Sequence, residues 1–220
     1  MSTGLASRES TNPQTQRVRT LYRYAARLYD PFRTGWSRLT RPIETALDGL
    51  FRDRIGAETR VLELAPGTGI NVDRLLRLAP EFASYLGVDA SGEMLERARV
   101  RSGGDPRIEL RRGDVTDPEA IEGRFGFIVS TWMLSHIEEP AATIRSALGH
   151  LDPGGSAVFV FLSPPANPFF RRTLARLGGP LRYRPVDPAP LRDLAGFERL
   201  ESAAGGMATL VVYRAAPAAC

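Results

Sequence analysis

Three acidic residues lie in or just after three short predicted strands in the first half of the sequence. Glu63 lies within VLEL, Asp89 ends LGVD, and Asp114 follows RRG. Residues 65–69, APGTG, form a turn that leads directly into a helical pattern. Chains pass in this way from strand to helix where backbone amides approach a ligand closely. Acidic side chains beside such a turn could hold hydroxyl or cationic groups of that ligand.

The residues around the glycine turn narrow the choice of ligand. A P-loop requires a lysine, and the chain contains none. A dinucleotide site uses G-x-G-x-x-G, and Val72 stands where the third glycine would be. Glu63 would also repel a pyrophosphate. S-adenosylmethionine, which has no phosphate and carries a sulfonium and an ammonium group, fits this combination of residues better.

The two aspartates complete a predicted site for the adenosyl part of this ligand. Asp89 lies about 20 residues beyond the turn, where a carboxylate accepts both ribose hydroxyls. Asp114 follows the third predicted strand, where a carboxylate can accept the adenine amino group. Either aspartate could instead cap a helix or turn, although Ser91 is the better candidate for the cap of the helix after Asp89.

Alternating strand and helix patterns must position these residues. They predict an α/β, Rossmann-like sheet of seven mostly parallel strands, with helices on both faces. The last two strands are separated only by residues 203–207, so they should form an antiparallel hairpin. The predicted strands are 60–64, 84–88, 108–112, 125–131, 156–162, 197–203 and 208–214. The predicted helices are 72–78, 92–101, 118–121 and 140–148, with a Pro-interrupted stretch over 168–194.

The remaining segments predict the domain organisation. Residues 1–16 are polar and are expected to be a disordered leader. Residues 17–55 have a helical pattern with a break near 31–36 and are expected to form an N-terminal arm or lid. Residues 56–220 are expected to form the sheet domain, with a substrate-side insertion at about 164–190.

Composition limits the classes of function. The chain has no apolar run of about 18 residues, and its polar start lacks an apolar signal segment, so we expect a cytoplasmic protein without stable membrane insertion. With one cysteine and two histidines, no Cys/His metal cluster is expected. The net charge is +4, but the arginines are scattered along the chain, so no nucleic-acid interface is expected. We expect a monomer or homodimer.

In this order and spacing, the motifs resemble those of class I S-adenosylmethionine-dependent methyltransferases over about residues 22–214. Residues 63–69 resemble the first motif, with Ala65 where glycine is commoner; a methyl group should leave the backbone path intact. Residues 127–137 resemble the fourth motif, where cofactor and substrate meet, and residues 153–155 resemble the turn before the fifth strand. The resemblance implies cofactor contacts from Glu63, Ala65, Gly67, Gly69, Asp89, Ala90, Met94, Asp114, Val115 and Ser130.

The arm also resembles a known group. Tyr22, Ala26 and Tyr29 share one helix face in a pattern similar to the entry helix of quinone-biosynthesis C-methyltransferases and related small-molecule enzymes. This resemblance implies a lid whose tyrosines reach the reacting end of the cofactor; the alternative is a helix that packs on the domain. His136, after the fourth strand, is a candidate base, and a purely structural histidine is the alternative. Met94 could contact adenine or belong to the core.

These observations predict methyl transfer from S-adenosylmethionine to an O, N or C nucleophile of a small molecule. The basic, Pro-rich residues 164–190 could bind an acidic or aromatic acceptor or form a solvated connection. Three alternatives stay open. They are a phospholipid N-methyltransferase, an enzyme of the same fold that consumes the cofactor itself as substrate by intramolecular or non-methyl alkyl transfer, and a non-catalytic binding module.

Overall fold

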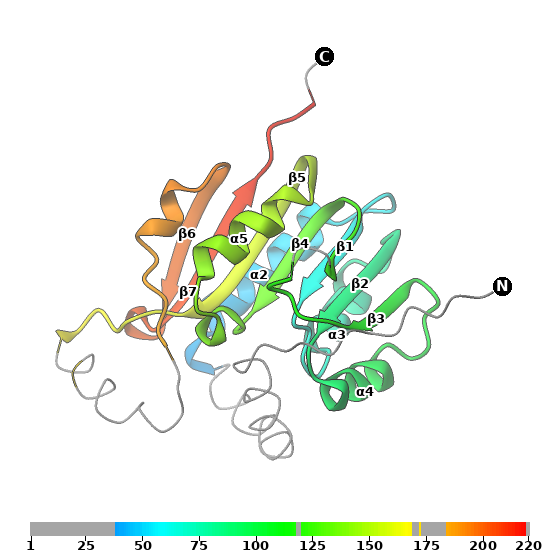
Figure 1. The fold of residues 1–220 in the computed structure, drawn as a ribbon, viewed down its shortest axis with the longest axis horizontal. Helices are drawn as coiled ribbons and strands as arrows, with labels where there is room; N and C mark the ends of the chain where they lie inside the picture. The colour runs from blue at the N-terminus through cyan, green and yellow to red at the C-terminus, as the bar shows by residue number, and fades with distance from the viewer. Residues whose placement is uncertain (1–37, 118–119, 169–171, 173–183, 219–220) are drawn as a thin grey trace.

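The computed structural model describes residues 38–117, 120–168, 172 and 184–218, which contain one seven-stranded sheet (Figure 1). The strand order is β3-β2-β1-β4-β5-β7-β6. Because each of the first five strands pairs in parallel, their carboxyl ends lie at one edge of the sheet. The strands are β1 (Arg60–Leu64), β2 (Ser84–Asp89), β3 (Ile108–Arg112), β4 (Phe125–Thr131), β5 (Leu151–Leu162), β6 (Phe197–Ala203) and β7 (Ala208–Arg214).

The predicted hairpin is confirmed. β7 runs antiparallel to β6 and also antiparallel to β5, so it lies between them. The predicted start of β5 was late: the strand begins at Leu151, five residues before the predicted start at Ser156. Its pairing with β4 is irregular there, and Gly154 has a φ of +74°. A glycine in the left-handed conformation is typical of turns, so the sequence predicted a turn over the first residues of β5.

Helices cover both faces of the sheet, as predicted (Figure 1). Because alternate residues of a strand point to opposite faces, each strand supplies two cores. Val61 packs in one core, with residues of α2 and α3, and Leu62 packs in the other, with residues of α5. The helices are α2 (Arg41–Arg54), α3 (Ile70–Leu78), α4 (Gly92–Arg101) and α5 (Pro140–Gly149).

The α2 helix is a structural part of the sheet domain. Its residues Ile43, Leu47, Leu50 and Phe51 recur at helical spacing and are all buried. The Phe51 ring meets the Phe127 ring of β4 edge-on, with 5.2 Å between ring centroids. The last helix of the predicted arm therefore packs in the core and brings its polar face to the carboxyl edge of β1 and β4.

Several predicted segments lie outside the described residues: the leader, the arm through residue 37, residues 118–119 of a predicted short helix, and most of the 168–183 stretch. The division into leader, arm and domain therefore stays a prediction. Among the helices that the structure describes, none is long and apolar enough to cross a membrane.

Candidate functional site

The glycine turn joins β1 to α3 through three left-handed residues. Ala65, Gly67 and Gly69 have φ values of +56°, +56° and +81°. The Ala65 N–H donates to the Val88 carbonyl at 2.8 Å, so the turn is held against the end of β2. The backbone path expected of the first motif is therefore present, with alanine in a conformation that normally favours glycine.

Glycine suits positions 67 and 69 of the turn for two different steric reasons. A Cβ built on Gly67 would meet nothing within 4 Å, so the space beside it is open. A Cβ built on Gly69 would lie 2.8 Å from the Ala98 Cα atom, within the backbone of α4. Gly67 thus leaves room for a ligand, whereas Gly69 allows α3 and α4 to approach closely.

Asp89 ends β2 beside this turn and is 9% exposed. Its Oδ2 atom accepts from the Gly67 N–H at 2.9 Å, and its Oδ1 atom accepts from the Ser91 N–H at 2.8 Å. Burial raises the pKa of Asp89, and the two amide hydrogen bonds oppose that rise. A carboxylate can accept about four hydrogen bonds, so two amides leave capacity for a pair of hydroxyls.

The residues after Asp89 position α4. The predicted cap is confirmed, because the Ser91 Oγ atom accepts from the Met94 N–H at 3.3 Å. Met94 is buried, and Ala90, between Asp89 and Ser91 in the sequence, is partly exposed.

Asp114 lies beside Asp89, because the Gly113 N–H donates to the Asp89 carbonyl at 3.0 Å. Its Oδ1 atom accepts from the Thr116 N–H at 2.9 Å and from the Thr116 hydroxyl at 2.7 Å, which shapes the loop after β3. Val115 is partly buried against the α5-side core. The two predicted adenosyl-contacting aspartates are therefore neighbours at one edge of the sheet.

Glu63 is almost fully buried, and both of its oxygens have partners. Oε2 accepts from the Tyr85 hydroxyl at 2.5 Å, and Oε1 accepts from the Asn71 amide at 2.7 Å. Burial raises the pKa of Glu63 to about 7, although both hydrogen bonds and the charge of Arg74 oppose the rise. A direct contact of Glu63 with the cofactor stays a prediction.

A cavity of about 50 Å³ lies beside the turn. Its wall contains an acidic side chain, Glu44 from α2, and a basic one, Arg74 from α3. Trp132 also lines the cavity and has a φ of +67°; its backbone N–H donates to the Val160 carbonyl at 2.6 Å. The remaining lining residues are 65–68, Ile70, Asn71 and Thr131.

Glu44, Asn71, Arg74 and Thr131 were missed from sequence. Asn71 and Arg74 are 2% and 8% exposed, although asparagine and arginine on a short helix are usually solvated. One feature of the sequence pointed to Asn71 and Arg74. Each directly precedes a buried apolar residue, Val72 or Leu75, so both lie beside the apolar face of the helix.

The predicted site residues of the fourth motif differ in how deeply they are buried. The Ser130 hydroxyl is buried and donates to the Leu64 carbonyl at 2.9 Å, so it holds β4 to the start of the turn. His136 is partly buried in a short 3-10 segment, Leu134–His136, and burial lowers its pKa. Tyr22 and Tyr29 lie outside the described residues. Within the described ranges, no group of three or more His, Cys, Asp or Glu side chains could hold a metal ion.

Comparison with known proteins finds similarity to methyltransferases. Residues 61–155 match the family model described as a methyltransferase domain. A demethylmenaquinone methyltransferase of Clavibacter sepedonicus is 34% identical over 116 residues, which are 53% of this chain and 46% of the relative. A phosphatidylethanolamine N-methyltransferase of Cereibacter sphaeroides is 32% identical over 104 residues, 46% of this chain and 49% of that protein. A ubiquinone biosynthesis O-methyltransferase of Xanthomonas euvesicatoria is 31% identical over 109 residues, covering 49% and 43%.

The chain thus spans about half the length of these curated relatives. Among solved structures, magnesium protoporphyrin IX methyltransferase from Synechocystis, with bound S-adenosylhomocysteine, has a TM-score of 0.66 at 16% identity, covering 91% of this chain and 99% of that one. The N-methyltransferase NodS from Bradyrhizobium japonicum has a TM-score of 0.61 at 16% identity, covering 79% and 86%. Residues 61–155 therefore resemble a methyltransferase domain, and the sheet that contains them has the fold of these solved methyltransferase structures.

Proposed function

We propose that this chain transfers the methyl group of S-adenosylmethionine to an oxygen, nitrogen or carbon nucleophile of a small molecule. The observation that carries the proposal is the pairing of the Gly67 amide with Asp89 at 2.9 Å. It joins an open glycine turn to a carboxylate at the end of the next strand, where the matched domain family is expected to hold ribose.

The residues present fit this cofactor. Asp89 keeps acceptor capacity for the ribose hydroxyls, and Asp114 with Val115 would meet the adenine edge. The open side of Gly67 permits close approach. Glu44 and Arg74 give the cavity wall both charge signs, which suits an amino-acid end that carries an ammonium and a carboxylate.

When bound, the cofactor would supply an electrophilic methyl group on sulfur. The protein's contribution is to orient the two partners and to exclude water, which can account for most of the acceleration of a displacement. Thr131, which ends β4, and Trp132, which follows it, line the cavity on the side expected to face the acceptor. We further propose that Tyr22 and Tyr29 close the site from the arm.

His136 is the proposed proton acceptor for hydroxyl or amine substrates. Burial lowers its pKa, so the imidazole is neutral at physiological pH and can accept a proton. A carbon or amine acceptor that is already nucleophilic would not require this step.

The relatives support a small acceptor without defining the reacting atom, because their names include both N- and O-methyltransferases. A phospholipid acceptor is the second candidate, favoured by the phosphatidylethanolamine N-methyltransferase relative. Methylation of phosphatidylethanolamine vesicles would separate it from the first. We also propose a cytoplasmic monomer or homodimer that binds no nucleic acid, which size-exclusion chromatography and a DNA-binding titration would test.

The test is incubation of the purified chain with methyl-labelled S-adenosylmethionine and a panel of quinols, carboxylic acids and amines. Mass spectrometry should detect S-adenosylhomocysteine together with a labelled acceptor. Formation of methylthioadenosine instead would indicate that another carbon of the cofactor is attacked. Absence of cofactor binding would contradict the proposal altogether.

A further inference from the structure

Arg74 makes three directed contacts from one buried guanidinium. Its Nε atom donates to Oδ1 of Asp48 at 2.6 Å, and its Nη2 atom donates to Oε2 of Glu44, so two of the contacts reach α2. Its Nη1 atom donates to Oδ1 of Asn71, one turn earlier on α3. The guanidinium also lies over the Phe51 ring, 5.8 Å from the centroid. One side chain therefore joins α2 to the start of α3.

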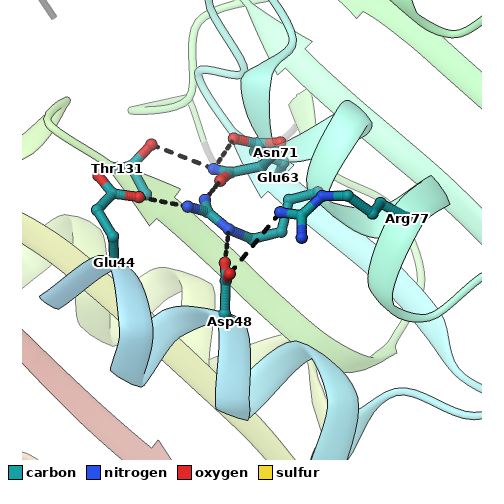
Figure 2. A network of polar contacts seen from close by, with 7 residues as sticks. Glu44, Asp48, Glu63, Asn71, Arg77 and Thr131 are labelled. Carbon is teal, nitrogen blue, oxygen red and sulfur yellow. Dashed lines mark hydrogen bonds and ion pairs between the residues drawn. The ribbon is translucent and has the colours of Figure 1, made fainter. Parts of the chain in front are cut away.

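The contact with Arg74 determines how the Asn71 amide is oriented. Because arginine only donates, the Asn71 atom that faces it must be the carbonyl oxygen. The NH₂ group then faces the other way, where it donates to Oε1 of Glu63 at 2.7 Å and to Oγ1 of Thr131 at 3.2 Å (Figure 2). Asn71 is 2% exposed, so no solvent competes for these contacts.

We propose that Arg74 is a positioning residue that acts through Asn71, so that the seating of α2 determines the arrangement of polar groups around the amino-acid end of the cofactor. The inference rests on the proposed function. Glu44, Asn71, Arg74 and Thr131 all belong both to this set of contacts and to the wall of the 50 Å³ cavity beside the glycine turn.

Charge alone does not explain the arrangement. Arg77 also pairs with Asp48, at 3.7 Å, but its side chain is 61% exposed. In Figure 2 a dashed line joins Arg77 to Asp48 and none joins Arg77 to Asn71. A lysine at position 74 would keep the charge but could not serve three acceptors in the plane of a guanidinium. Arg77 therefore offers a matched control on the same helix.

The experiment compares two ligands by calorimetry: S-adenosylhomocysteine, and methylthioadenosine, which lacks the amino-acid end. Arg74→Lys should weaken S-adenosylhomocysteine binding about tenfold and change methylthioadenosine binding less than about twofold. Arg77→Ala should leave both affinities unchanged. Equal weakening of the two ligands by Arg74→Lys, or no weakening of either, would overturn the inference.

A double-mutant cycle tests whether Arg74 acts through Asn71. Asn71→Ala cuts the link and leaves the pairs of Arg74 with Glu44 and Asp48 in place. If the inference holds, adding Arg74→Lys to Asn71→Ala should weaken S-adenosylhomocysteine binding by less than about twofold more. Full additivity of the two single effects would overturn it, because Arg74 would then act by another route.

If circular dichroism shows that Arg74→Lys is unfolded, a second variant keeps the test available. The triple change Glu44→Gln, Asp48→Asn, Arg74→Met removes all three charges together, and the cation that loses an ionic partner, Arg77, is exposed. It should show the same selective loss for S-adenosylhomocysteine, and an equal change in the two affinities, or no change in either, would overturn the inference. A wild-type protein that bound neither ligand would overturn the proposed function, and this inference with it.

Discussion

The Gly67 amide donates a hydrogen bond to Oδ2 of Asp89, with 2.9 Å between nitrogen and oxygen. This contact joins residues 22 positions apart, one in the turn after β1 and one at the end of β2. Two parts of the proposed adenosyl site therefore hold each other in place, and a change in either should affect both.

Asp89→Ala should weaken S-adenosylhomocysteine binding by about ten- to a hundredfold, because it removes the proposed acceptor for two ribose hydroxyls and frees the Gly67 amide. Calorimetry gives the affinity. Glu96→Ala is a suitable control, because Glu96 is exposed on α4 and pairs only locally with Arg99. Unchanged affinity in Asp89→Ala would contradict the assignment of this residue.

Substitutions at the two glycines should separate binding from stability. Gly67→Val should abolish cofactor binding and cost about 1–2 kcal/mol of stability, because the side chain enters open space but adopts a strained φ. Gly69→Ala should lower the melting temperature more, because its Cβ would lie within 2.8 Å of the α4 backbone. Thermal unfolding and calorimetry on both variants make the comparison. Normal binding by Gly67→Val would exclude this turn as the cofactor site.

Ala65→Gly should raise the free energy of unfolding by about 1 kcal/mol, because alanine at a φ of +56° is strained and glycine is not. Urea unfolding measures the change. Ala90→Gly, at the first residue after β2, is the control and should bring no gain, since Ala90 is not among the positive-φ residues. A loss of stability in Ala65→Gly would show that the turn relaxes without strain.

Glu63 should make stability depend on pH. Its pKa is raised from 4.5 to about 7 by burial, so the folded state holds the proton more tightly than the unfolded chain does. The contribution of Glu63 is therefore full below pH 4.5, falls as the pH rises towards 7, and is constant above that. Urea unfolding between pH 4 and pH 8 should show the wild type losing stability relative to Glu63→Gln over this interval. A flat or rising difference would indicate that Glu63 is not buried as described.

Truncation should test the proposed lid. Deleting residues 1–15 should change neither stability nor turnover, because their polar composition predicts no packing. Deleting residues 1–30 should lower turnover far more than stability, since the described core begins with α2. Tyr29→Phe should cost about 0.5–1.5 kcal/mol of transition-state binding if the hydroxyl contacts cofactor or substrate. Full activity of the longer truncation, or its complete unfolding, would remove the lid proposal.

The sequence by itself determined the order of strands and helices, the C-terminal hairpin and the glycine turn. These follow from local features: the period of apolar residues, and the glycines at positions 67 and 69 where the turn requires positive φ. The nearness of Asp89 and Asp114 was also predictable, because parallel strands bring their carboxyl ends to one edge.

Only the tertiary structure decided the surroundings of Glu63 and the burial of Asn71 and Arg74. On the sequence, Arg74 is one of 29 basic residues, and its spacing beside Val72 and Leu75 indicates the buried side of its helix without indicating a partner. It is buried because α2, more than 20 residues away, brings Glu44 and Asp48 to meet it. The partners of a polar side chain depend on which elements pack together, and that information is absent from the periodicity of any single element.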